Sequence, residues 1–232
     1  TRLDFLMKRE SVLRSIDAVR QLASRLPLDL VVVGDGDARD DIEAAAAKAN
    51  TELRREAVRL LGAMDDPRGA YAAADIIIGM GTSVVRGMAF NKPVIVLGED
   101  GYSETFSPET ATALGDSGFY GFAHGDPDNA ELCKRIEELV TDDALRQSLA
   151  GSSRALVVAR FDLDVIGAAL GEWYDKVVAT PVDRSPAVLA RGATAAAYKL
   201  YFQTRQLAGR IVRRGARKYS SPRPERTDSA AT

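Results

Sequence analysis

Short apolar runs that end in glycine recur along this chain, separated by stretches with helical periodicity. Four of these runs are predicted strands, at residues 28–33, 58–61, 75–78 and 93–97, and a weaker fifth is predicted at 118–122. Helices are predicted at residues 10–26, 38–50, 67–74, 82–90, 129–140, 143–160 and 163–178. Apolar strands that alternate with helices are typical of a parallel sheet covered on both faces, so we predict an α/β, doubly wound domain.

The charge of the chain is unevenly distributed. Residues 181–232 carry 11 Lys and Arg against three Asp and Glu, whereas residues 1–180 carry 20 against 30. We therefore predict an acidic domain over residues 1–180 and a basic, partly helical tail over residues 181–232. The acidic domain offers no electrostatic surface for nucleic acid, whereas the tail could meet an anionic membrane or another polyanion.

Cysteine and histidine each occur once, as Cys133 and His124. One cysteine forms no intrachain disulfide, and the two residues cannot complete the four-ligand set of a usual zinc site. A triad could use only His124, and no Gly-x-Ser-x-Gly elbow is present, so a hydrolase is disfavoured. No run approaches the roughly 20 apolar residues of a membrane-spanning helix, and no signal-peptide pattern is present, so we expect a cytoplasmic protein.

The glycines after the first predicted strand, Gly34 and Gly36, resemble the start of a dinucleotide fingerprint. Arg39 stands where its third glycine belongs, which disfavours a nicotinamide or flavin site. Nearby carboxylates could hold a divalent cation, but aspartate is also common at helix starts, and we favour that explanation for Asp35, Asp37, Asp40 and Asp41.

The segment 74–97 carries the most information about function. A predicted strand leads into Gly79-Met80-Gly81, and a predicted helix begins at Thr82. Because glycine has no Cβ, the amides of this turn and of the helix start with Ser83 can approach a diphosphate or sugar hydroxyls closely.

In full this segment reads Ala-Asp-Ile-Ile-Ile-Gly-Met-Gly-Thr-Ser-Val-Val-Arg-Gly-Met-Ala-Phe-Asn-Lys-Pro-Val-Ile-Val-Leu, and it resembles the donor-binding motif of the retaining GT-B glycosyltransferases (glycosyl transferases group 1). Stretches at 1–8, 31–36, 60–62 and 71–75 extend the resemblance over about residues 1–180. The resemblance implies a Rossmann-like GT-B C-terminal domain that binds a nucleoside-diphosphate sugar. It also implies transfer of the glycosyl group to an acceptor with retention of configuration, without a metal or other cofactor.

The resemblance implies roles for particular residues. Arg2 and Lys8 match the family's cations that hold the donor diphosphate, where positive charge stabilises the leaving group. Backbone contacts are implied at Gly81, Thr82 and Ser83 for the diphosphate and sugar, and at Gly34, Gly62, Ala63 and Met64 for the nucleoside.

Two carboxylates of the family motif are missing. Ile78 and Arg86 stand in the positions of the glutamates that contact the transferred sugar and the ribose. Isoleucine accepts no hydrogen bond and arginine only donates, so Arg86 would contact the diphosphate or pair with a carboxylate. The alternatives to an active transferase are a degenerate, non-catalytic GT-B-like module and a GT-B epimerase. A phosphorylase and a Rossmann oxidoreductase are disfavoured, since neither a pyridoxal-binding lysine nor a complete dinucleotide fingerprint is recognisable.

The family's N-terminal acceptor domain is missing from this sequence, and Arg2 falls where the first strand of the C-terminal domain should already have ended. We therefore expect a fragment of a longer enzyme, with a truncated first strand and a gap in the sheet. Between Lys199 and Lys218, apolar residues share a helical face beside several arginines. This pattern predicts an amphipathic helix that lies on an anionic membrane, docks on the missing domain or remains at the surface.

Overall fold

A computed structural model describes residues 3, 8–180, 191, 193–201 and 204 of the chain. The chain divides into two compact units, Thr1–Gly171 and Glu172–Thr232. The predicted boundary at residue 180 between a binding domain and a tail stays a prediction. Of the tail, residues 191, 193–201 and 204 are helical, and the remainder of the predicted helix between Lys199 and Lys218 lies outside the described residues.

The first part of unit 1 is a two-stranded parallel sheet with two helices on one face. It comprises α1 (Arg9–Leu22), β1 (Leu30–Val33), α2 (Arg39–Leu53) and β2 (Val58–Gly62), and β1 pairs with β2. Val32 and Val58 point into a core formed with Ile16 and Val19 of α1 and with Ile42 of α2. On the opposite face, Val31 and Leu61 are exposed.

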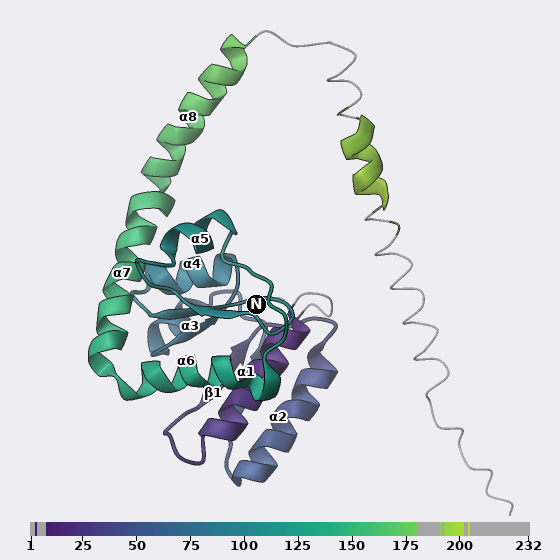
Figure 1. The fold of residues 1–232 in the computed structure, drawn as a ribbon, viewed down its shortest axis with the longest axis vertical. Coiled ribbons are helices and arrows are strands. Elements are labelled where there is room, and N and C mark those ends of the chain that lie inside the picture. Colours follow the sequence, from purple (N-terminus) through teal and green to yellow (C-terminus); the bar gives the residue numbers. More distant parts are fainter. Residues whose placement is uncertain (1–2, 4–7, 181–190, 192, 202–203, 205–232) are drawn as a thin grey trace, which may run out of the picture. The chain divides into compact units, whose positions relative to one another are not determined.

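The second part is built around a three-stranded sheet with helices on both faces. It begins with α3 (Arg68–Ala73), β3 (Ile77–Gly79), α4 (Thr82–Ala89), β4 (Val94–Leu97) and β5 (Ser103–Thr105). β3 and β4 are parallel, while β5 is antiparallel to β4. The chain continues through α5 (Ala111–Asp116), a short 3₁₀ helix η1 (Pro127–Asn129), α6 (Ala130–Thr141), α7 (Asp143–Phe161) and α8 (Leu163–Ala179) (Figure 1).

The side chains of β4 alternate between two cores, because successive residues of a strand point to opposite faces. Ile95 and Leu97 pack with α1 and with Leu132 and Ile136 of α6. Val94 and Val96 pack on the other face with buried residues of α4, α5 and α7 (Val84, Met88, Leu114 and Val157). This arrangement confirms the predicted α/β fold class with parallel strands, but the strands form two sheets, only the β3-β4-β5 sheet has helices on both faces, and β5 is antiparallel.

Several predicted elements need correction. The prediction of a fifth strand at 118–122 was wrong. Gly118 and Phe119 have positive φ angles of 69° and 57°, which an extended strand does not allow. In this stretch only an isolated bridge between Glu99 and Phe122 occurs. The helix predicted to end at residue 26 ends at Leu22, and β5 and α5 were not predicted from the sequence.

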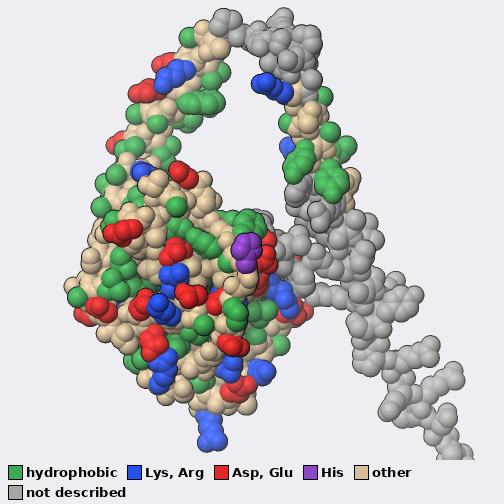
Figure 2. All heavy atoms as spheres, in the orientation of Figure 1, with side chains coloured by type: hydrophobic (Ala, Val, Ile, Leu, Met, Phe, Trp, Pro, Cys, Tyr) green, Lys and Arg blue, Asp and Glu red, His purple; other side chains and the backbone are tan. Residues whose placement is uncertain are grey.

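Helix α8 is apolar and exposed along its length. None of its residues is buried, and its large hydrophobic side chains, such as Leu163, Leu170, Trp173 and Val178, are at least 43% exposed (Figure 2). In the described part of the chain, no helix is both long and apolar enough to cross a membrane.

Candidate nucleotide-sugar site

The loops after β1 and β2 lie side by side. The register of the two parallel strands places Val33 opposite Gly62, and the Gly34 N–H donates to the Gly62 carbonyl at 2.7 Å. The residues that follow, Ala63 and Met64, are exposed. The structure therefore brings together the four residues predicted to flank a nucleoside.

The loop after β3 forms a tight turn into α4. Gly81 is the N-cap of α4 at φ 58° and ψ −131°, a conformation open only to glycine. Its N–H donates to the Phe119 carbonyl at 2.9 Å, and the Ser83 hydroxyl donates to the Met80 carbonyl at 2.7 Å. The amides of Thr82 and Ser83 remain at the first turn of α4, where no intrahelical acceptor exists and where the helix dipole favours an anion.

Of the two predicted diphosphate cations, Lys8 is described and Arg2 lies outside the described residues. Lys8 is half-buried at the N-cap of α1. Leu3 is buried and is held by the loop after β1, since its N–H donates to the Asp35 carbonyl and its carbonyl accepts from the Ala38 N–H. The structure thus fastens the residue next to Arg2 to the same end of the sheet as Gly34.

The two positions that lack the family's glutamates differ in their surroundings. Ile78 packs, partly buried, against the core on the α1 and α6 side of β4. Arg86 is exposed on α4, and its positive charge lies close enough to the Tyr71 hydroxyl to favour the ionised phenol. The Tyr71 ring stacks on Phe90 with centroids 5.7 Å apart, and burial raises the pKa of Tyr71. Arg86 therefore meets a phenol here, and its predicted contact with a diphosphate stays a prediction.

The loop after β4 is bound to the start of α1. The Glu10 carboxylate accepts from the Gly101 N–H at 3.0 Å, and the Ser11 hydroxyl donates to the Gly98 carbonyl at 3.1 Å. The side chain of Glu99 accepts a hydrogen bond from the Tyr120 hydroxyl. The contact between Glu99 and Tyr120 was not predicted from the sequence, because 21 residues separate them.

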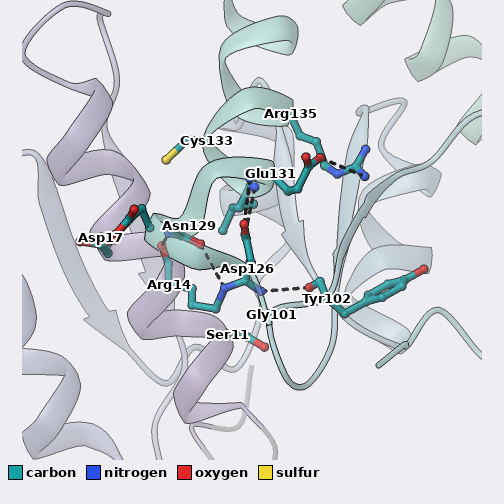
Figure 3. A network of polar contacts seen from close by, with 12 residues as sticks. Ser11, Arg14, Asp17, Gly101, Tyr102, Asp126, Asn129, Glu131, Cys133 and Arg135 are labelled. Atoms are coloured by element: carbon teal, nitrogen blue, oxygen red, sulfur yellow. Dashed lines mark hydrogen bonds and ion pairs between the residues drawn. The ribbon is translucent and has the colours of Figure 1, made fainter. Parts of the chain in front are cut away.

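A buried ion pair lies beside the same loop and holds it to α1 (Figure 3). The Arg14 guanidinium of α1 contacts the Asp126 carboxylate at 2.6 Å, the Asn129 side-chain oxygen at 3.0 Å and the Tyr102 carbonyl at 3.1 Å. The side chains of Arg14 and Asp126 are only 12% and 3% exposed. Asp126 also accepts from the Glu131 N–H at the start of α6, so it caps that helix while it neutralises Arg14.

Two of the four aspartates after β1 form ion pairs with arginines. Asp35 pairs with Arg39, and Asp41 pairs with Arg9 at 2.6 Å. Within the described ranges, no group of three or more His, Cys, Asp or Glu side chains is arranged to hold a metal ion. Asp35 and Asp41 thus lie in ion pairs, and the expectation that the chain uses no metal stays a prediction.

Comparison with known proteins identifies the family. The sequence model of the family described as glycosyl transferases group 1 matches residues 4–142, which is more than half of the chain. The chain belongs to this family. The fold class and the GT-B resemblance predicted from the sequence are therefore confirmed.

A curated member of the group 1 glycosyltransferases is similar in sequence. The lipopolysaccharide core biosynthesis glycosyltransferase LpsE of Rhizobium meliloti is 27% identical over 156 residues. The match covers 63% of this chain and 42% of LpsE, so the chain spans less than half the length of this relative.

Solved structures show the same fold. HepE of Anabaena, crystallised with UDP, matches with a TM-score of 0.55 and 24% identity, over 76% of this chain and 47% of HepE. The C-terminal domain of LpcC, a group 1 glycosyltransferase of Francisella tularensis, matches with a TM-score of 0.52 and 18% identity, over 67% of this chain and 82% of that domain. A further HepE structure contains UDP and glucose and matches with a TM-score of 0.56 and 23% identity, over 76% of this chain and 47% of HepE.

The stability of the protein at alkaline pH tests the contact between Tyr120 and Glu99. Burial raises the pKa of Tyr120 above its ordinary value of 10.0, and the hydrogen bond to Glu99 with the charges of Glu99, Glu10 and Asp100 adds to the rise. The folded protein then holds this proton more tightly than the unfolded chain, so the stabilisation is complete below about pH 10 and is lost as the pH rises above it. We expect Tyr120→Phe to lose stability less steeply above about pH 10 than the wild type.

Urea denaturation at a series of alkaline pH values measures this difference. Tyr174→Phe changes an exposed tyrosine on α8 and serves as the control, with the wild-type profile expected. Equal alkaline slopes for Tyr120→Phe and the wild type would contradict the predicted contact.

Proposed function

We propose that this chain is the donor-binding part of a glycosyltransferase that takes a glycosyl group from a nucleoside-diphosphate sugar. The observation that carries the proposal is the convergence of loops at one end of the parallel strands. The paired loops at Gly34 and Gly62 would flank a nucleoside, and the α4 amides after Gly81 would hold an anion. Solved relatives that hold UDP, or UDP and glucose, support the choice of ligand class.

The proposed chemistry depends on stabilising the leaving diphosphate. Negative charge develops on that group as its bond to the sugar breaks, and the first-turn amides of Thr82 and Ser83 with Lys8 and Arg2 would neutralise it without a metal. We also propose that the transfer retains the configuration of the sugar and that an N-terminal domain holds the acceptor. A cleft closed by two domains would orient both reactants. We further propose a cytoplasmic enzyme whose basic tail contacts an anionic membrane surface.

Calorimetric titration of the intact full-length protein with UDP, GDP and ADP, and with NAD for comparison, tests the donor site. We expect saturable binding of one of these nucleoside diphosphates. The double variant Arg2→Ala, Lys8→Ala should bind it at least about tenfold more weakly, because each hydrogen bond from a charged group contributes about 1.5–3 kcal/mol.

The control variant Lys48→Ala removes an exposed lysine of α2 whose nearest carboxylate, that of Glu52, is 4.0 Å away. Its affinity should equal that of the wild type. Failure of the folded wild-type protein to bind any nucleoside diphosphate overturns the proposed function, and binding of NAD in their place favours a Rossmann oxidoreductase.

The second candidate function is a non-catalytic binding module. Ile78 and Arg86 favour it, because Ile78 packs against a core and Arg86 lies near the Tyr71 phenol, so neither position offers a carboxylate to the donor. Such a module binds a nucleoside diphosphate but does not consume the nucleotide sugar when acceptors are supplied. Conversion of the nucleotide sugar into its epimer, with no acceptor present, would instead identify a GT-B epimerase.

A further inference from the structure

A sugar bound at the proposed donor site needs a hydrogen-bond acceptor, and the two family positions do not supply one. Ile78 is apolar and faces a core, and Arg86 only donates. Sugar hydroxyls are donors as well as acceptors, and a carboxylate in the site distinguishes sugars that present a hydroxyl to it from sugars that do not. The acceptor must therefore come from another loop at this end of the sheet.

Glu99 lies in the appropriate loop. It directly follows Gly98 at the end of β4, the neighbour of β3, and it is half-buried. The chain segment 119–121 links it to the α4 turn: the Phe119 carbonyl accepts from the Gly81 N–H at 2.9 Å, and the Gly121 carbonyl accepts from the Glu99 N–H at 3.0 Å. Glu99 and the N-terminus of α4 are thus fastened to the same three residues.

The start of α1 reaches the same place. Glu10 accepts from the amides of Asp100 and Gly101 at 3.4 and 3.0 Å, which sets Lys8, two residues earlier at the N-cap of α1, close to the Glu99 loop. Lys8 and the α4 amides favour an anion, whereas a carboxylate repels phosphate. Glu99 therefore suits the uncharged hydroxyls of the sugar attached to the diphosphate.

The Glu99 carboxylate is oriented before any ligand arrives. Tyr120 donates its hydroxyl proton to Glu99, and a pKa raised by burial keeps that phenol protonated at neutral pH. A carboxylate has about four lone-pair sites, and the bond to Tyr120 uses one of them, which leaves acceptor capacity for a ligand. Glu99 is therefore available to bind a ligand, and Tyr120 holds its carboxylate in place.

We propose that Glu99 recognises the sugar of the nucleoside-diphosphate donor by accepting hydrogen bonds from its hydroxyls, and that Tyr120 positions it. This inference rests on the proposed function, and it gives the site a carboxylate that the family motif would otherwise place at Ile78 or Arg86. It also separates two contributions to donor binding, with the nucleoside diphosphate held by the glycine loops and cations and the sugar held by Glu99.

Calorimetric titration of the intact protein with a nucleoside diphosphate and with its nucleotide sugar separates these contributions. The probes are UDP with UDP-glucose, GDP with GDP-mannose and ADP with ADP-glucose. For the pair that the wild type binds, we expect Glu99→Gln to lower the ratio of nucleotide-sugar affinity to nucleoside-diphosphate affinity about tenfold, with the nucleoside-diphosphate affinity unchanged. Tyr120→Phe should lower the same ratio about threefold, because it leaves the carboxylate in place but less ordered.

Glu138→Gln makes the same chemical change at an exposed position on α6 and should leave both affinities unchanged. An unaltered ratio in Glu99→Gln overturns the role of Glu99, and so does an equal weakening of both ligands, which would mark Glu99 as structural. Absence of nucleoside-diphosphate binding by the wild type overturns the proposed function itself and this role with it.

Discussion

Replacing Asp126 with alanine is expected to lower the free energy of unfolding by about 3–5 kcal/mol, the cost of leaving a buried charge without its partner. Its carboxylate is 3% exposed and contacts Arg14 at 2.6 Å. The substitution strands the Arg14 guanidinium and also removes the acceptor for the Glu131 N–H at the start of α6. Urea denaturation followed by circular dichroism measures the loss.

The pair between Asp66 and Arg68 is a matched control. Its atoms are 2.7 Å apart, but the side chains are 55% and 77% exposed. Asp66→Ala should cost much less than Asp126→Ala, because water screens the exposed pair and the loss is mainly the hydrogen bond from the Arg68 N–H. We also expect Arg14→Ala combined with Asp126→Ala to cost less than the sum of the single variants, since no unpaired charge then remains. Strict additivity would show that the two side chains do not interact energetically.

Gly98→Ala is the second substitution with a large expected effect. A Cβ built at this position lies 1.9 Å from the Gly121 carbonyl oxygen, and the obstacle is backbone that belongs to the loop beneath the candidate sugar site. Overpacking usually costs about 1–3 kcal/mol, and because no flexible side chain can move aside here we expect about 3 kcal/mol or more. The variant should also lose the sugar-dependent part of donor binding, since Glu99 is the next residue.

Gly151→Ala is expected to have the opposite effect on stability. Gly151 lies inside α7, and a Cβ there meets no atom within 4 Å. Alanine should therefore stabilise the protein by about 0.5–1 kcal/mol through its lower backbone entropy. Thermal melting of both variants tests these two predictions. A Gly98→Ala protein as stable as the wild type would show that the backbone at Gly121 moves aside with little loss of stability.

The sequence predicted the elements whose signals are local. β1 to β4 are apolar and end beside glycines, and α4 begins where Gly81 permits the turn. β5 escaped prediction because Ser103–Thr105 is short and polar, and it is a strand only through its pairing with β4. The run at 118–122 misled for the opposite reason, since apolar residues there adopt positive φ angles that a sequence pattern does not reveal.

Some features of the candidate site could likewise be predicted from the sequence, and others could not. The glycines that shape its loops are visible in the sequence because their backbone conformation demands them. The contacts of Glu99 with Tyr120 and of Arg14 with Asp126 join residues 21 and 112 positions apart, so only the folded chain reveals them. Arg86 was recognised as a departure from the family, but its phenolic partner, Tyr71, was not.

Helix α1 belongs to two cores at once. Ile16 and Val19 pack beneath the sheet of β1 and β2, while Ala18 and Leu22 pack with β4 and α6. A single inserted residue would turn every later side chain of the helix by about 100° and misplace both sets together. Insertions and deletions should therefore be tolerated least in α1, and homologues that vary in length should do so in the loop that follows it.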